Sequence, residues 1–195
     1  MTSHVNLLVS QCFYRLRRIK NCCRALPRDA VKTLVNSFVT SRVDSCNCLL
    51  ASTPALTTNK LQRVLNAAAK VIYDGRKFDH VRCCYVTSYI GLKYQNSITY
   101  KLCLLTYKAF HGLAPQYLAD LCQPLSQIAL RRSRRSSTAG HLLVPRTCTK
   151  FGQKGFSVAG PRACNSLLPL VRQADGLSTF KRLLKQHLFN VSYMI

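Results

Sequence analysis

Apolar residues recur with a helical period along most of this chain, and the pattern is clearest between residues 30 and 74. Two apolar-periodic segments lie there, joined by a connection that contains Ser, Thr, Pro and Asn. The first segment repeats at i, i+3, i+4, i+7 and i+8, with Val31, Leu34, Val35, Phe38 and Val39. The second repeats in the same way, with Leu61, Val64, Leu65, Ala68, Val71 and Ile72. That period places each set on one face of a helix, so we expect the two faces to be buried against each other as a helical hairpin.

The same pattern predicts further helices on either side of this hairpin. The expected ranges are 5–23, 28–50 with a break near 41–44, 58–73, 96–110, 115–122 and 179–189. Helix stops are expected at Pro27, at Asp74-Gly75 and at His111-Gly112. The expected N-caps are Thr57 or Thr58 for the third helix, Asn96 or Ser97 for the fourth and Ser178 for the last.

The remaining segments have weaker patterns. Val86–Leu92 reads as a short strand or a buried loop, 141–145 as a short strand, and 156–168 as a helix-loop element. Residues 123–140 lose apolar density and are expected to form a mobile loop. We therefore predict a mainly α protein with a small helical bundle over 1–122, a basic loop over 123–140, and a less regular segment over 141–195. The last segment would hold short helices and one short strand pair.

The charge of the chain is its most unusual property. It has 29 Lys and Arg residues against 6 Asp and no Glu, which gives a formal net charge of +23 on 195 residues. Such a chain repels itself unless an anionic partner or counterions offset the charge. Nucleic acid is the first class of partner that this suggests, and an anionic membrane is the second. The alternative is a merely basic surface on a sequence under little selection, because net charge bears on solubility rather than on fold.

The chain has 11 cysteines, an odd number, and no segment that resembles a signal peptide or a membrane span. We therefore expect an intracellular protein, nuclear or cytoplasmic, that keeps its thiols reduced. The cysteines form no Cys-x-x-Cys pair of the kind that zinc sites normally use. His80 with Cys83 and Cys84 is the nearest approach to a ligand cluster, but free cysteines are more often small buried apolar residues. No metal and no other cofactor is expected.

Four blocks of residues carry a resemblance to a known family. The first comprises Leu34-Val35, Val39-Thr40-Ser41-Arg42-Val43-Asp44, Cys46-Asn47 and Leu49-Leu50. The second comprises Leu61-Gln62-Arg63-Val64 and Asn66-Ala67-Ala68-Ala69. The third comprises Lys101, Leu104-Leu105-Thr106-Tyr107-Lys108-Ala109, Gly112-Leu113-Ala114-Pro115 and Tyr117-Leu118. The fourth comprises Val144-Pro145-Arg146-Thr147, Phe156-Ser157, Ala159, Pro161-Arg162, Asn165-Ser166-Leu167, Phe180-Lys181, Leu184-Lys185 and Leu188-Phe189. In this order, over nearly the whole chain, they resemble the thumb and the following C-terminal segment of LINE-type (non-LTR) retrotransposon reverse transcriptases.

The resemblance implies a thumb-like helical bundle that grips nucleic acid. It also implies that the catalytic residues of such a polymerase are not found in this sequence. The palm of these polymerases, which precedes the thumb, holds two divalent metals with paired aspartates, and this chain has no Asp-Asp pair. The family pattern also carries Trp near Ser88–Gln95 and near Cys164, whereas this chain has no Trp. The chain therefore resembles a decayed or truncated open reading frame of such an element, without polymerase activity.

The thumb of a polymerase contacts the backbone of its template–primer, so the resemblance implies phosphate contacts by the basic face of the first helices. The candidates are Arg15, Arg18, Lys20 and Arg24, with Arg63 and Lys70 as alternatives. Lys and Arg supply positive charge, and Arg adds a forked set of donors that matches phosphate. Such contacts would be independent of base sequence and sensitive to salt. For any one of these residues, the alternative is an ordinary solvated helix face.

A second basic cluster lies in the expected loop, at Arg131, Arg132, Arg134 and Arg135. It could act as a nuclear-localisation-like signal or as a flexible RNA-binding arm. Phosphorylation of Ser133, Ser136 or Ser137 would weaken either role. An unconstrained linker is the alternative.

The sequence offers little support for a catalytic site. His80, His111 and His141 belong to no motif that ties a base to a nucleophile, and the chain has no Glu for general acid catalysis. Residues 152–155 are too few for a phosphate-binding loop. We therefore expect a non-catalytic remnant that binds RNA or DNA backbone non-specifically, with no membrane partner and no small-molecule substrate. The alternative is a translated transposon fragment with no dedicated function, a structural piece of a larger polymerase.

Overall fold

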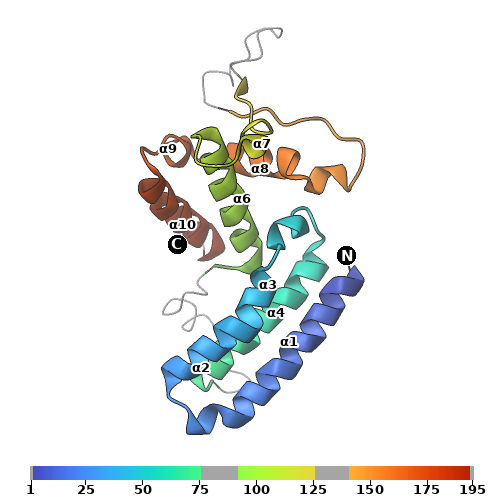
Figure 1. Ribbon diagram of the computed structural model, residues 1–195, viewed down its shortest axis with the longest axis vertical. Coiled ribbons are helices and arrows are strands. Elements are labelled where there is room, and N and C mark those ends of the chain that lie inside the picture. The colour runs from blue at the N-terminus through green and yellow to red at the C-terminus, as the bar shows by residue number, and fades with distance from the viewer. Residues whose placement is uncertain (1, 76–91, 126–140, 194–195) are drawn as a thin grey trace. The chain divides into compact units, whose positions relative to one another are not determined.

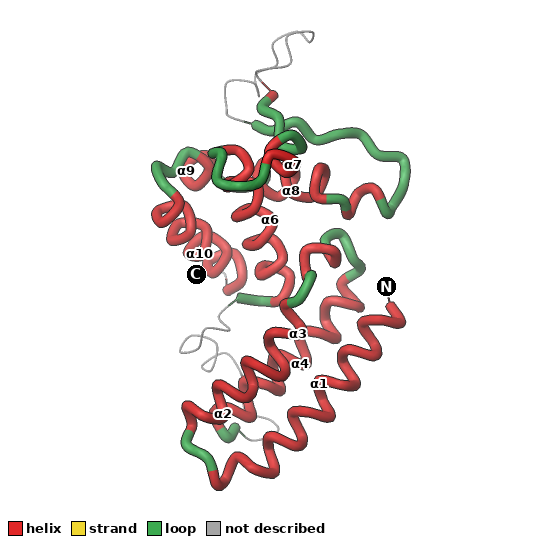
Figure 2. The backbone as a smooth tube through the Cα atoms, viewed as in Figure 1, coloured by secondary structure: helices red, strands yellow, loops and turns green. Residues whose placement is uncertain are grey.

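The computed structural model describes residues 2–75, 92–125 and 141–193, and these residues are mainly helical, as the sequence predicts (Figures 1 and 2). The described residues contain one extended pairing, an isolated antiparallel bridge between Pro124 and Leu142. This bridge is all that the structure shows of the strand expected at 141–145. The segments 86–91 and 126–140 lie outside the described residues, so the predictions made for them stay predictions.

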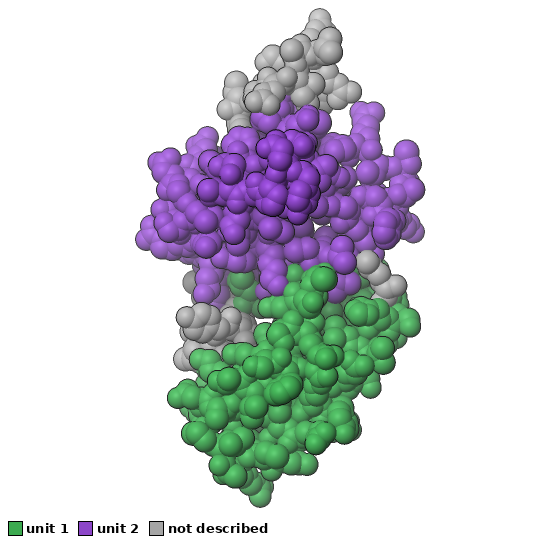
Figure 3. Space-filling view, viewed as in Figure 1, with its two compact units in different colours: residues 1–47, 53–95 green, residues 48–52, 96–195 purple. Residues whose placement is uncertain are grey.

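The chain divides into two compact units, which Figure 3 shows in different colours. Unit 1 contains residues 1–47 and 53–95, and unit 2 contains residues 48–52 and 96–195. The main division therefore falls at residue 95, earlier than the boundary at residue 122 that the sequence pattern suggests. Periodicity shows that a helix has a buried face, but it does not show which elements cover that face.

Unit 1 is a bundle built on two long helices. Its helices are α1 (Thr2–Cys22), α2 (Arg28–Val35), α3 (Ser41–Asp44) and α4 (Ala55–Tyr73), with a 3₁₀ turn at Cys23–Ala25. α1 packs along α4, and α2 packs against both of them. The predicted contact between α2 and α4 is present, but α4 packs more extensively against α1. Leu16, Val35 and Leu61, one from each of these three helices, are among the buried core residues.

A π-helical stretch at Asn36–Thr40 joins α2 to α3, so the predicted second helix continues without a break to Asp44. The chain then leaves the helix at Ser45, which is extended, and at Cys46, which has a φ of +52°. The side chain of Asn47 follows, almost fully buried, and its amide donates a hydrogen bond to Asp44 Oδ1 at 3.3 Å. The break therefore lies just past its predicted position, because a side-chain contact fixes the turn.

The start of α4 differs from the prediction. The N-cap residue is Pro54, whose carbonyl accepts the backbone N–H of Thr57 at 2.9 Å. Thr57 and Thr58 lie buried within the first turn, and the Thr58 hydroxyl donates to the Ala55 carbonyl at 3.1 Å. The N-cap role predicted for these threonines is therefore wrong. Proline suits the extended N-cap conformation because its ring fixes φ, so the helix begins directly after it.

Unit 2 has two long helices that share a core. Its helices are α6 (Tyr94–Phe110, with its first two residues in unit 1), α7 (Gln116–Ala119), α8 (Phe156–Asn165), α9 (Pro169–Arg172) and α10 (Leu177–Tyr193). The ring of Tyr107 on α6 stacks on the ring of Phe180 on α10, with centroids 4.1 Å apart. The Tyr107 hydroxyl also donates to the Ala174 carbonyl at 3.0 Å, just before α10 begins.

The N-cap predicted for α6 is wrong as well. The helix begins at Tyr94, so Asn96 and Ser97 lie inside its first turn. The Asn96 amide instead donates to α10, to the Leu188 carbonyl at 2.9 Å and to the Ser192 hydroxyl at 2.6 Å. A polar residue near a helix start looks the same in sequence whether it caps its own helix or binds a neighbouring one.

Two other helices of unit 2 differ from prediction by a few residues. α10 begins at Leu177, so Ser178 lies in its first turn and is not its N-cap. α7 covers only Gln116–Ala119 of the helix predicted over 115–122, and Pro115 is its N-cap residue. The predicted stop of α6 is confirmed, because Gly112 has a φ of +67°, a left-handed conformation that glycine adopts without strain.

Candidate nucleic-acid interface

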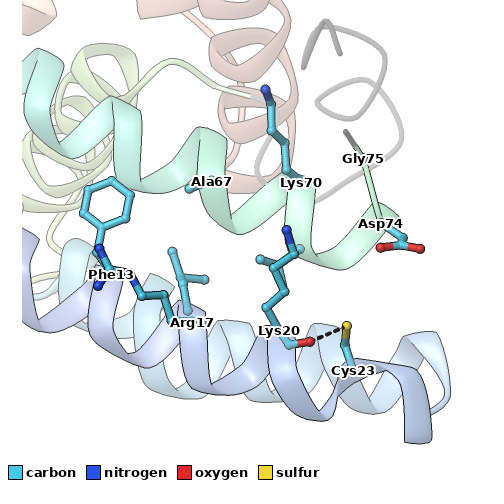
Figure 4. Close-up of a pocket in the computed structure, with 10 residues that line it drawn as sticks. Phe13, Arg17, Lys20, Cys23, Ala67, Lys70, Asp74 and Gly75 are labelled. Atoms are coloured by element: carbon cyan, nitrogen blue, oxygen red, sulfur yellow. Dashed lines mark hydrogen bonds between the residues drawn. The ribbon is translucent and has the colours of Figure 1, made fainter. Parts of the chain in front are cut away.

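A groove of about 310 Å³ lies between α1 and the C-terminal half of α4 in unit 1 (Figure 4). Its lining residues are Phe13, Leu16, Arg17, Lys20 and Cys23 from α1 and the turn after it, and Ala67, Lys70, Val71, Asp74 and Gly75 from α4 and its end. Three of these side chains are cations and five are apolar or lack a side chain. In Figure 4 the Lys20 side chain points from α1 toward α4. The groove is therefore an apolar trough with positive charge along it.

Helical spacing explains why these cations line one groove. Arg17 and Lys20 are at i and i+3 on α1, so they are neighbours on one face of that helix. α1 and α4 run in the same direction (Figure 1), and near their starts Lys60 Nζ donates to Asn6 Oδ1 at 2.7 Å. The parallel course brings the last turns of both helices together, so Lys70 of α4 lines the same groove as Lys20 of α1.

The end of α4 sets one end of the groove. Asp74 adopts a left-handed conformation with a φ of +49°, and the Gly75 N–H donates to the Lys70 carbonyl at 2.9 Å. This is the helix stop that the sequence predicts at Asp74-Gly75. Asp74 is the one acid among the lining residues, and its exposed carboxylate is directed away from Lys70 in Figure 4. With three cations to one carboxylate, the groove carries net positive charge.

The structure brings two of the predicted contact residues, Lys20 and Lys70, into this groove. Arg18 and Arg24 do not line it and are exposed, one on α1 and one in the 3₁₀ turn that follows. Arg63 is exposed on α4, seven residues before Lys70, so the two occupy the same side of that helix. The predicted residues on unit 1 therefore cover more surface than the groove itself.

Arg15 takes part in the packing of unit 1. Its Nη1 donates to the carbonyl of Phe38 at 3.0 Å, in the π-helical stretch between α2 and α3. A guanidinium has five N–H donors, so this bond leaves others for phosphate. It nevertheless directs the side chain toward the α2–α3 side of α1 rather than toward the groove.

Sequence reasoning missed two groove residues, Phe13 and Arg17. Their signal was present, because Phe13, Arg17 and Lys20 follow one another at i, i+4 and i+7 and share a stripe of α1. In sequence, Arg17 resembles its neighbours Arg15 and Arg18 on the polar part of the helix, and the partner of Phe13 is evident only once α1 and α4 lie side by side. Which of the neighbouring cations on one helical turn line a groove can be decided only when the packing partner of the helix is known.

The second basic cluster, Arg131, Arg132, Arg134 and Arg135, lies outside the described residues. The same is true of His80, Cys83 and Cys84, the nearest approach to a metal-ligand cluster in the sequence. Within the part of the chain that the structure describes, no three His, Cys, Asp or Glu side chains gather in a way that would hold a metal ion.

The nine cysteines in the described ranges are all free thiols. Burial raises the pKa of Cys12, Cys103 and Cys122 above the ordinary thiol value. Burial also raises the pKa of Cys164 to about 11, against a smaller lowering by Arg172. These four thiols therefore stay protonated near neutral pH, where a thiol is a weaker nucleophile than a thiolate.

Comparison with protein-family models, with curated proteins and with solved structures finds no match to this chain. Over the described ranges, none of the helices combines the length and the apolar character needed to cross a bilayer. The molecule is thus a strongly basic, mainly α protein with a cationic groove on its first unit.

Proposed function

We propose that this chain binds the phosphate backbone of nucleic acid, without sequence specificity, through the groove of unit 1. The observation that carries the proposal is that Arg17, Lys20 and Lys70 all line one groove between α1 and α4. The net charge of +23 attracts any polyanion. The groove would be the site at which the phosphates of a nucleic acid bind. Contacts from Lys and Arg to phosphate position a backbone without reading its bases, so the binding is independent of sequence.

The remaining basic residues extend this surface. Arg18, Arg24 and Arg63 are exposed on unit 1, where a backbone that follows α1 or α4 could contact them. Arg15 keeps donors that the Phe38 carbonyl does not use. The cluster at 131–135 is a further candidate for backbone contacts on the basis of its charge.

We also propose that the chain derives from the thumb of a LINE-type reverse transcriptase and has no catalytic activity. The four sequence blocks and their order support this origin, and a helical bundle with a cationic groove is compatible with a thumb. Because the palm aspartates have no counterpart in the sequence, the activity that such a remnant would keep is the grip on nucleic acid.

A filter-binding titration of the full chain tests the proposal. The probes are a short RNA and its duplex, each measured from about 50 mM to about 200 mM salt. We expect a Kd of about 10⁻⁶ to 10⁻⁴ M near physiological salt, with log K falling linearly against log salt. Absence of retention at low salt would falsify the proposal.

A second candidate is that the chain has no dedicated function and is a translated fragment of a larger polymerase product. Large apolar side chains on its surface favour this candidate, since Phe151 is 79% exposed, Leu56 75% and Leu170 73%. Side chains of this kind are normally covered when they form patches, and in a whole polymerase a palm would be available to cover them. This candidate predicts poor solubility, and cooperative unfolding of the isolated chain in calorimetry would count against it.

A further inference from the structure

Tyr14 presents an exposed aromatic ring on the outer side of α1. Its side chain is 60% exposed, and the guanidinium carbon of Arg18 lies 5.8 Å from the centre of its ring. The two residues are at i and i+4, so the arginine covers one face of the ring from the next turn of the helix. A ring with that exposure and one covered face keeps its other face open to solvent.

This ring lies beside the groove on the same helix. Arg17, which lines the groove, is three residues after Tyr14, and side chains at that spacing are neighbours, with Cβ atoms about 5–6 Å apart. Lys20 follows Arg17 at the same spacing and continues the line of positive charge into the groove. A strand with phosphates at Arg17 and Lys20 therefore has a base within reach of Tyr14.

We propose that Tyr14, with Arg18 against one face of its ring, is a stacking platform for an unpaired base, and that the nucleic acid held at this site is single-stranded. The inference rests on the proposed function, because it assumes that the groove holds phosphates. A positively charged track combined with an aromatic ring holds single strands of any sequence, since every base has a face that can stack.

A double helix cannot use this platform, because its bases are already stacked inside the duplex. Charge alone favours the duplex, which carries a negative charge every 1.7 Å or so, against about 3.4 Å for each strand. A preference for the single strand at equal salt therefore reports stacking rather than charge.

The test uses the full chain and three variants, Tyr14→Ala, Tyr14→Phe and Tyr117→Ala, at one low salt concentration. The probes are a single-stranded oligonucleotide that carries 2-aminopurine and a duplex of the same sequence. Tyr117 is the matched control, because it is an exposed tyrosine (68%) on α7 of unit 2. Circular dichroism of each variant is the check on folding, and we expect unchanged helical content because the substituted positions are exposed.

We expect the unmodified chain to bind the single strand more tightly than the duplex and to quench 2-aminopurine. Tyr14→Ala should weaken single-strand binding by about fivefold or more and remove the quenching, because an aromatic–base stack is lost. Tyr14→Phe keeps the ring and should retain both properties, as should Tyr117→Ala.

Two outcomes overturn the platform while leaving the proposed function in place. One is single-strand binding that is equally tight for Tyr14→Ala and the unmodified chain, with unchanged quenching. The other is tighter binding of the unmodified chain to the duplex. A third outcome, no binding of either probe at low salt, removes the proposed function and this inference with it.

Discussion

Gly160 of α8 lies so close to Thr106 of α6 that a Cβ built on the glycine would be 2.6 Å from the threonine hydroxyl oxygen. The ring of Phe156 adds a second constraint, because its Cε2 would be 2.9 Å from the same Cβ. Because glycine has no side chain, α8 can approach α6 closely at this point. This contact explains a glycine inside a helix, a position that ordinarily costs about 0.5–1 kcal/mol relative to alanine.

Gly160→Ala is expected to destabilise the chain, although alanine is the better helix former. Forcing extra volume into a packed contact costs about 1–3 kcal/mol. Because the new Cβ would meet two side chains at under 3.0 Å, we expect a cost in the upper part of that range, above the gain of about 1 kcal/mol in helix propensity. Urea unfolding measures the change. The double variant with Thr106→Ala should lose less than the sum of the two single changes, because the hydroxyl no longer meets the new methyl group. Strict additivity would contradict this account of the contact.

Asn96→Ala should lower the free energy of unfolding by about 1–3 kcal/mol, because its amide joins α6 to the Leu188 carbonyl and the Ser192 hydroxyl of α10. Chemical denaturation provides the measurement. Asn190→Ala, at an exposed position of α10, is the matched control and should change stability by less than about 0.5 kcal/mol. An equal loss in both variants would mean that the amide contributes no more than a surface residue.

The half-buried thiol of Cys164 predicts a loss of stability at alkaline pH. Burial raises its pKa from an ordinary 9.0 to about 11. A folded-state pKa above the unfolded value gives a stabilisation that is fully present below pH 9 and is lost as the pH rises through about 11. The slope from this one group should reach about 1.4 kcal/mol per pH unit.

The contribution of Cys164 is isolated by comparison with Cys164→Ala. Both chains are unfolded with urea from neutral pH to about pH 11. The comparison is needed because other thiols and tyrosines also titrate in this range. The unmodified chain should lose stability more steeply above pH 9 than the variant does. Parallel curves over that range would show that this thiol ionises equally well in the folded and unfolded chains.

The elements of the fold could be predicted from the sequence more reliably than their ends. α4 and α10 follow the apolar period because one face of each is buried, and burial constrains every third or fourth residue. The helix ends depend on single contacts, so Pro54 rather than Thr57 is the N-cap residue of α4, and Asn96 binds α10 instead of capping α6. A threonine or an asparagine can make either kind of hydrogen bond, and only the packed structure decides between them.

The sequence predicted several basic residues of the candidate site, but it did not predict the groove that two of them line. Lys20 and Lys70 are basic residues on two helices, and nothing in the sequence shows that α1 and α4 run in parallel with their last turns together. The hairpin expected from the apolar pattern paired α4 with α2, which would have left Lys70 without Lys20 as a neighbour. Placing α1 along α4 is what makes Arg17 and Phe13 part of the groove.

The most direct test of the central claim measures the salt dependence of nucleic-acid binding in two triple variants with the same change of charge. One variant removes the groove cations with Arg17→Gln, Lys20→Gln and Lys70→Gln. The other removes three exposed cations of α10 with Lys181→Gln, Arg182→Gln and Lys185→Gln. Because each single-strand phosphate contact contributes about 0.7 to the slope of log K against log salt, the groove variant should have a slope smaller in magnitude by about 2. The α10 variant should keep the slope of the unmodified chain, and equal changes in both variants would show that binding follows net charge alone and that the groove is not the site.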